Sequence, residues 1–129
     1  KYTLNEMIRH INGEAGLMAY LGTTDIRAIM KRIEAGDSYA EEVMDAMCYQ
    51  TAKEIGAMAT VLEGRVDAIL LIGGMANVPF ITEHITKRVD FIAPVLIMPG
   101  EREMEALAQG SYRAIKGEIP MQTFIPKNS

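Results

Sequence analysis

A nearly continuous apolar run at residues 66–72, interrupted only by Asp67, is the feature that most constrains the fold of this chain. The run ends at the glycine pair Gly73-Gly74, and this combination is typical of a strand that is buried on both faces of a parallel sheet. A second apolar run, residues 94–98, ends at Pro99-Gly100. The segment between them has helical spacing, so the sequence predicts a right-handed strand–helix–strand unit. Two strands alone make a poor sheet, and the runs therefore predict neighbours outside this chain.

The rest of the chain has helical periodicity. The longest pattern predicts a helix of about seven turns that begins at an S-x-x-E capping box, Ser38 and Glu41, and ends at Gly64. A preceding helix is expected to start at Thr24 as N-cap and to end before Gly36. The sequence therefore predicts a helix-rich α/β fold.

Shorter patterns complete the assignment. Residues 4–11 and 104–115 have apolar side chains in helical phase, whereas residues 17–21 form an apolar stretch too short to assign. Asn77 is a candidate N-cap for the helix that contains Pro79 in its first turn. The segment 118–129 is expected to be a peripheral tail, which leaves residues 1–117 as the structured unit.

Composition and charge exclude several classes of protein. The chain has 129 residues, 49% hydrophobic and 23% charged, which is the composition of an ordinary globular domain. At this size a compact fold would bury roughly two thirds of the surface of the unfolded chain. The net charge is −4, with no Lys/Arg run longer than two residues, so we expect neither nucleic acid nor a membrane as partner. The single cysteine, Cys48, fits a small buried side chain in a cytoplasmic protein.

The strongest candidate for a ligand site is the segment from Gly73 to Asn77, at the carboxyl end of the first predicted strand. Open α/β sheets bind ligands at this edge, and glycines let a ligand approach the backbone closely. The pattern is neither a dinucleotide fingerprint nor a Walker A loop. Taken alone, it is also what a tight turn without a ligand would show. Met75 could line an adenine pocket.

Other polar residues have ordinary structural explanations. Asp25 and Arg27 fit the first turn of a helix. His10 and His84 are not surrounded by other metal ligands at a suitable spacing, so we interpret both as surface or packing residues and expect no metal site in this chain.

Four segments carry a family resemblance: residues 16–25, 40–58, 66–76 and 91–108 resemble butyrate kinases of the acetokinase family. The resemblance runs in order through nearly all of residues 1–117. It implies the C-terminal, nucleotide-side part of an enzyme with a ribonuclease-H-like fold, as in the actin-like ATPase superfamily. The implied reaction transfers phosphate between ATP and butyrate, with ATP/ADP as substrate and Mg²⁺ as the expected metal. The chain begins at Lys1, which fits a piece of a longer protein.

The resemblance also implies roles for particular residues. The motif Gly73-Gly74-Met75-Ala76 matches an adenosine motif, with Gly74 nearest the nucleotide and Met75 against the base. Asp25 is then a ribose partner, Ile26 and Arg27 line the base pocket, and Asn77 contacts a phosphate.

No catalytic residue is expected in this chain. It lacks the glycine-containing phosphate loops and the Arg/His/Asp set that would hold an acyl phosphate. We expect these groups in the missing N-terminal part, which would also bind butyrate or butyryl phosphate. The alternatives are a related short or branched-chain carboxylate kinase and a non-catalytic nucleotide-binding module. A homo-oligomer is compatible with either function.

Overall fold

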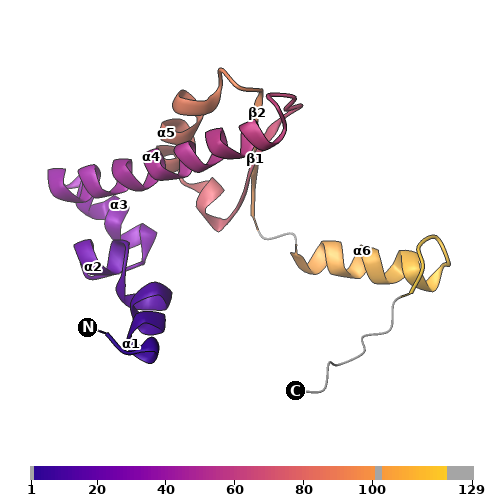
Figure 1. Ribbon diagram of the computed structural model, residues 1–129, viewed down its shortest axis with the longest axis horizontal. Helices are drawn as coiled ribbons and strands as arrows, with labels where there is room; N and C mark the ends of the chain where they lie inside the picture. The colour runs from indigo at the N-terminus through magenta and orange to yellow at the C-terminus, as the bar shows by residue number, and fades with distance from the viewer. Residues whose placement is uncertain (1, 101–102, 122–129) are drawn as a thin grey trace.

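The computed structural model describes residues 2–100 and 103–121 (Figure 1). These residues form mostly helices, together with one small sheet. In chain order the elements are α1 (Leu4–Arg9), a π-helical turn (His10–Glu14), α2 (Leu17–Leu21), α3 (Ile26–Glu34), α4 (Ser38–Val61), β1 (Ile69–Gly73), a 3₁₀ turn (Gly74–Asn77), α5 (Pro79–Val89), β2 (Val95–Pro99) and α6 (Glu103–Ile115). The predicted helix-rich α/β fold is confirmed.

The two strands form a parallel pair, with β1 joined to β2 through helix α5. Their register places Ile69 opposite Val95 and Gly73 opposite Pro99. The predicted strand–helix–strand order is therefore confirmed, although β1 begins at Ile69 rather than at the start of the apolar run. In the part of the chain that the structure describes, β1 and β2 have no further strand beside them.

The prediction that the first strand is buried on both faces is wrong for the described residues. Ile69 is buried, but the side chains of Leu70 and Ile72 are 56% and 69% exposed. Side chains alternate between the two faces of a strand, so one face of β1 packs on the core and the other lies open. The outer face of β1 is thus apolar and exposed in the part of the chain that the structure describes.

The long helix α4 forms as its periodicity predicts, but its cap differs by one residue. Its N-cap is Asp37, whose Oδ1 accepts a hydrogen bond from the Ala40 amide at 3.0 Å. The capping box at Ser38 and Glu41 is therefore a wrong prediction. Helix α3 differs in the same way, because Asp25 rather than Thr24 is its N-cap. In both cases the residue beside the expected hydroxyl cap is an aspartate, and its carboxylate accepts the hydrogen bonds from the first free amides.

The start of α5 is only partly as predicted. Pro79 is its first residue, where its fixed φ and missing N–H do no harm. Asn77 does not cap this helix, since the N-cap is Val78 and has no side-chain hydrogen bond. The Asn77 Nδ2 instead donates to the carbonyl of Gly74 at 3.2 Å and closes the 3₁₀ turn.

The core lies where α4 meets α5 and the inner face of the sheet. Its most deeply buried side chains are Ile29, Met44, Cys48 and Val89, contributed by α3, α4 and α5. Figure 1 shows α4 and α5 side by side, and they share the most residue contacts of any two described helices. The predicted burial of Cys48 is confirmed.

Helix α6 contributes no side chain to the buried core among the described residues. Figure 1 shows α6 standing apart from the other elements, and its side chains of Met104, Leu107 and Ile115 are largely exposed. No helix among the described residues is long and apolar enough to span a bilayer. The tail predicted from residue 118 lies outside the described part beyond Met121.

Candidate functional site

The glycine turn after β1 forms one wall of a pocket. Gly73 has a φ of +83°, a backbone conformation that residues with a Cβ rarely adopt. The next four residues make the 3₁₀ turn that the Asn77 side chain closes. The turn also lies against the end of the second strand, because the amide of Gly100 donates to the carbonyl of Gly73 at 3.4 Å.

The start of α3 forms the opposite wall. The Asp25 amide donates to Thr23 Oγ1 at 3.1 Å, and Asp25 Oδ1 accepts from the amides of Arg27 and Ala28 at 2.9 and 3.4 Å. These bonds hold the backbone that leads into the helix. Both bonds that Asp25 accepts here go to its Oδ1.

Between these walls lies a cavity of about 1000 Å³. Six of the eight residues predicted for the site line it: Asp25, Ile26, Arg27, Gly74, Met75 and Asn77. Two segments far apart in the sequence are thus brought to one place. Gly73 and Ala76 do not line this cavity, and the buried Ala76 lines a different one beneath α4.

The cavity is also lined by three residues to which the sequence assigns no ligand contact of their own, namely Thr24, Val78 and Gly100. The position of Gly100 could have been predicted from the sequence. It follows the end of the second predicted strand, and the carboxyl ends of parallel neighbours lie at the same edge of a sheet. The sequence pattern predicts Thr24 as an N-cap, and in the structure it directly precedes the actual cap, Asp25. Val78 is the N-cap of α5. Its apolar side chain carries no group that would mark it as a ligand contact.

The cavity combines apolar and charged side chains. Its lining combines the apolar side chains of Ile26, Met75 and Val78 with one carboxylate, Asp25, and one guanidinium, Arg27. Within residues 2–100 and 103–121, no three His, Cys, Asp or Glu side chains are grouped so as to hold a metal ion. A ligand with a flat apolar part and hydroxyl groups fits such a lining.

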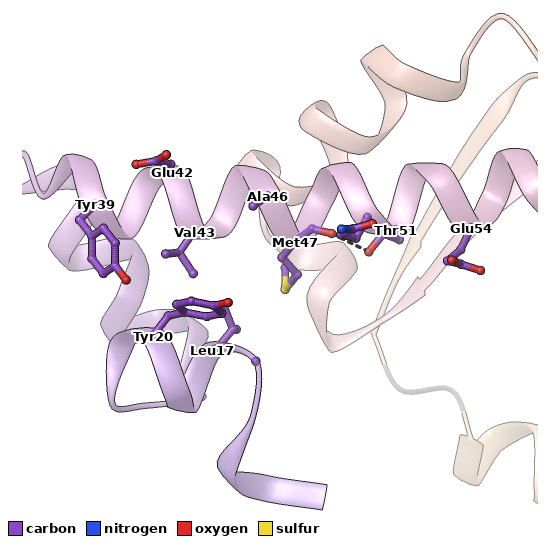
Figure 2. Close-up of a pocket in the computed structure, with 11 residues that line it drawn as sticks. Leu17, Tyr20, Tyr39, Glu42, Val43, Ala46, Met47, Thr51 and Glu54 are labelled. Atoms are coloured by element: carbon purple, nitrogen blue, oxygen red, sulfur yellow. Dashed lines mark hydrogen bonds between the residues drawn. The ribbon is translucent and has the colours of Figure 1, made fainter. Parts of the chain in front are cut away.

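A second hollow lies between α2 and α4, with a volume of about 740 Å³ (Figure 2). Figure 2 shows Leu17 and Tyr20 of α2 pointing toward Val43 of α4. None of the predicted site residues lines this groove. Its lining is mostly apolar, with Glu42 and Glu54 as its acidic residues.

His84 lies in a packing cluster on α5, as the sequence predicts. Its ring stacks on Phe80 with centroids 4.0 Å apart, and its Nε2 lies 3.7 Å from Asp45 Oδ1 on α4. Asp45 also pairs with Arg88 at 2.8 Å. The cluster joins α4 to α5 and takes no part in the cavity.

Comparison with known proteins shows the family of this chain. Residues 1–107 match the model of the acetokinase family, and the chain belongs to that family. Among individual relatives, it is 51% identical over 124 residues to a probable butyrate kinase of Bacteroides thetaiotaomicron, covering 96% of this chain and 35% of the relative. It is 52% identical over 118 residues to probable butyrate kinase 2 of Caldanaerobacter subterraneus, covering 92% of this chain and 33% of the relative. The chain thus spans about a third of the length of the curated relatives it matches.

Proposed function

We propose that this chain forms the adenosine side of the active-site cleft of a butyrate kinase. The observation that carries the proposal is the meeting of residues 25–27 and 74–77 in one cavity. The proposal is supported by the identity of about half the residues to probable butyrate kinases. The reaction is ATP + butyrate ⇌ ADP + butyryl phosphate, in which a butyrate carboxylate oxygen attacks the γ-phosphorus and the bond to the β,γ-bridging oxygen breaks.

In this proposal each wall of the cavity binds a different part of adenosine. Asp25 Oδ2 accepts a hydrogen bond from a ribose hydroxyl, while Ile26, Arg27 and Met75 contact the base. Gly74 allows the nucleotide to approach the backbone, and Asn77 lies on the side where the phosphates leave the pocket. Gly73 and Ala76 do not line the cavity, and in this proposal they only shape the backbone of the turn.

Groups outside this chain complete the proposed enzyme. Phosphoryl transfer depends on positioning and on neutralising the charge of the transferred group. When bound, Mg²⁺ would neutralise part of the negative charge of the phosphates. The described residues contain no cluster of metal ligands. In this proposal, the rest of the full-length protein binds the metal and the acyl phosphate. The parallel strands with their connecting helix fit a ribonuclease-H-like domain that further strands of the protein complete.

The test separates the two roles of Asp25 in the full-length protein. Asp25→Asn keeps an oxygen that can cap α3, whereas Asp25→Ala removes both the cap and the ligand. We expect Asp25→Ala to lower the stability of the folded state by about 1 kcal/mol and Asp25→Asn to change it little. Both variants should weaken ADP binding about tenfold, as loss of a hydrogen bond to a charged group does. Isothermal titration calorimetry measures the affinity and thermal unfolding the stability.

Two outcomes would point to another function. ADP binding without formation of butyryl phosphate by the full-length protein would favour a non-catalytic nucleotide-binding module. Faster initial rates with acetate or isobutyrate than with butyrate would favour a related carboxylate kinase, since the cavity described here contacts no acyl chain in the proposal. Unchanged ADP affinity in both Asp25 variants would remove the site assignment itself.

A further inference from the structure

The side chain of Arg32 joins three successive helices close to the cavity. Its Nη1 donates to the carbonyl of Leu21, the last residue of α2, at 3.0 Å. Its Nε donates to Asp37 Oδ2 at 2.8 Å, and its Nη2 lies 2.8 Å from the same oxygen. Arg32 itself belongs to α3 and Asp37 is the N-cap of α4. One guanidinium thus connects the end of α2, the body of α3 and the start of α4.

We propose that Arg32 is a positioning residue that holds the wall formed by residues 24–27 in its ligand-binding geometry. This wall follows directly from the anchored end of α2, because Gly22 and Thr23 alone separate Leu21 from Thr24. Leu21 is buried in the core, so its carbonyl is a fixed point. Arg32 approaches that point from the last turns of the same helix whose first turn carries Asp25, Ile26 and Arg27.

The contacts of Arg32 require a planar fork. A guanidinium presents donors in fixed directions, so it can bond the Leu21 carbonyl with one nitrogen and the Asp37 carboxylate with the others. The Arg32 and Asp37 side chains are 39% and 31% exposed, which leaves the pair partly shielded from water. The hydrogen bond from the Ala40 amide lowers the pKa of the Asp37 carboxyl from its ordinary value of 3.8, and the bond from the Arg32 guanidinium is the second cause. The pair is therefore fully charged at neutral pH.

Two further bonds make this corner of the fold rigid. The amide of Asp37 donates to the carbonyl of Arg32 at 3.0 Å, and Asp37 Oδ1 caps α4 through the Ala40 amide. Movement of α3 relative to α4 would break the bonds between Arg32 and Asp37, whereas the Ala40 bond would stay with α4. Because the glycine turn is fixed to the sheet, a shift of α3 changes the width of the cavity between the turn and residues 24–27. Displacements of this kind cost binding and rate even when no ligand contact is removed.

The inference rests on the proposed nucleotide site, and its experiment uses the full-length protein. The variants are Arg32→Gln, Arg32→Lys, Asp37→Asn and the double variant Arg32→Gln/Asp37→Asn. The matched control is Arg65→Gln, which removes an exposed ion pair with Glu63 at 2.8 Å that lies away from the cavity. ADP affinity is measured by calorimetry, and hydrogen exchange is followed in a peptide that covers residues 22–28.

We expect Arg32→Gln to raise the Kd for ADP about tenfold and to speed exchange in residues 22–28 more than in α5. Asp37→Asn, which keeps the capping oxygen, should do the same to a smaller extent, because the Leu21 bond remains. The double variant should add little to Arg32→Gln. Arg32→Lys should recover part of the affinity through its charge, and Arg65→Gln should match the unaltered protein.

Three results would overturn the inference. The first is unchanged ADP affinity in a folded Arg32→Gln protein, and the second is unchanged exchange in residues 22–28. The third is faster exchange spread evenly through the protein, which would show a general structural role. If the unaltered protein does not bind ADP, the proposed function fails, and the exchange pattern alone then decides whether Arg32 positions this wall.

Discussion

At the scale of single residues, Cys48 shows how burial controls chemistry in this chain. Its side chain has no exposed surface, and its Sγ lies 4.0 Å from the carbonyl of Ile81 across the α4–α5 contact. Burial, with the nearby Asp45 carboxylate as a second cause, raises the pKa of the thiol to about 11. The thiolate is the reactive form, so the native thiol is protected both by access and by ionisation.

This protection gives a direct prediction. At pH 8 the reaction of Cys48 with a disulfide reagent should be at least about a hundredfold slower in the native protein than in guanidinium chloride, because a raised pKa lowers the thiolate fraction. The rate is followed by absorbance, and the Cys48→Ala variant subtracts thiols elsewhere in the full-length protein. Equal rates in the native and unfolded proteins would contradict the burial of this side chain.

The helix caps mark the limit of what residues alone predict. Asp25 and Asp37 each stand beside a hydroxyl residue, Thr24 and Ser38, that satisfies the same sequence rule for an N-cap. The choice between neighbours depends on the backbone dihedral angles before the helix, which the sequence pattern does not specify. The error moves a helix by one residue, but it changes the role of Asp25 from a first-turn charge to a cap that also faces the cavity.

At the scale of elements, the contact of α4 with α5 combines a buried apolar seam with a charged clamp. Two bonds from Arg88 Nη2 reach the two carboxylate oxygens of Asp45 at 2.9 and 2.8 Å, and Nη1 of the same guanidinium donates to the carbonyl of His84. This side chain is 27% exposed. Such partly shielded, well-aligned pairs stabilise more than isolated surface pairs do.

We therefore expect Arg88→Ala to lower the free energy of unfolding by about 1 kcal/mol. The matched control is Arg113→Ala, whose ion pair with Glu118 at 3.3 Å is more exposed and should contribute no more than about 0.3 kcal/mol. Urea denaturation followed by circular dichroism measures both. Equal losses in the two variants would mean that the clamp adds nothing beyond an ordinary surface pair.

Elements were the most predictable level of this fold. The period of α4 and the two glycine-bounded apolar runs were sufficient to predict the long helix and the parallel strands. The cavity was predictable only through the family resemblance, because no local pattern links residues 25–27 to residues 74–77. Burial of the outer face of β1 was predicted wrongly, since it depends on elements beyond the described residues.

At the scale of the whole molecule, the chain exposes apolar surface that a compact domain would bury. Large apolar side chains are exposed on the outer face of the sheet and on α6, including Leu70, Ile72 and Leu107. Their positions on separate elements indicate several surfaces rather than one patch. The remaining two thirds of a relative's length provides enough protein to cover them.

The 129-residue chain, prepared by itself, should accordingly associate and bind a hydrophobic dye. We expect its sedimentation coefficient to rise with concentration and its enhancement of dye fluorescence to exceed that of the full-length protein. Ile72→Thr should reduce both effects more than Leu4→Thr, a control at an exposed position of α1. A monomer with no dye binding would indicate that these side chains are covered within the chain itself.

The edge of β1 away from β2 also has a consequence for a damaged copy of the protein in a cell. The amide of Ile69 and the carbonyl of Gly73 bond toward β2 and its continuation, so the alternate peptide groups of Leu70 and Ile72 point to the other edge. Any break in the gene or the protein that separates this segment from its covering parts leaves that edge as a template for pairing with other chains. Chaperones and proteases recognise such surfaces, so truncated copies should be removed by quality control rather than accumulate.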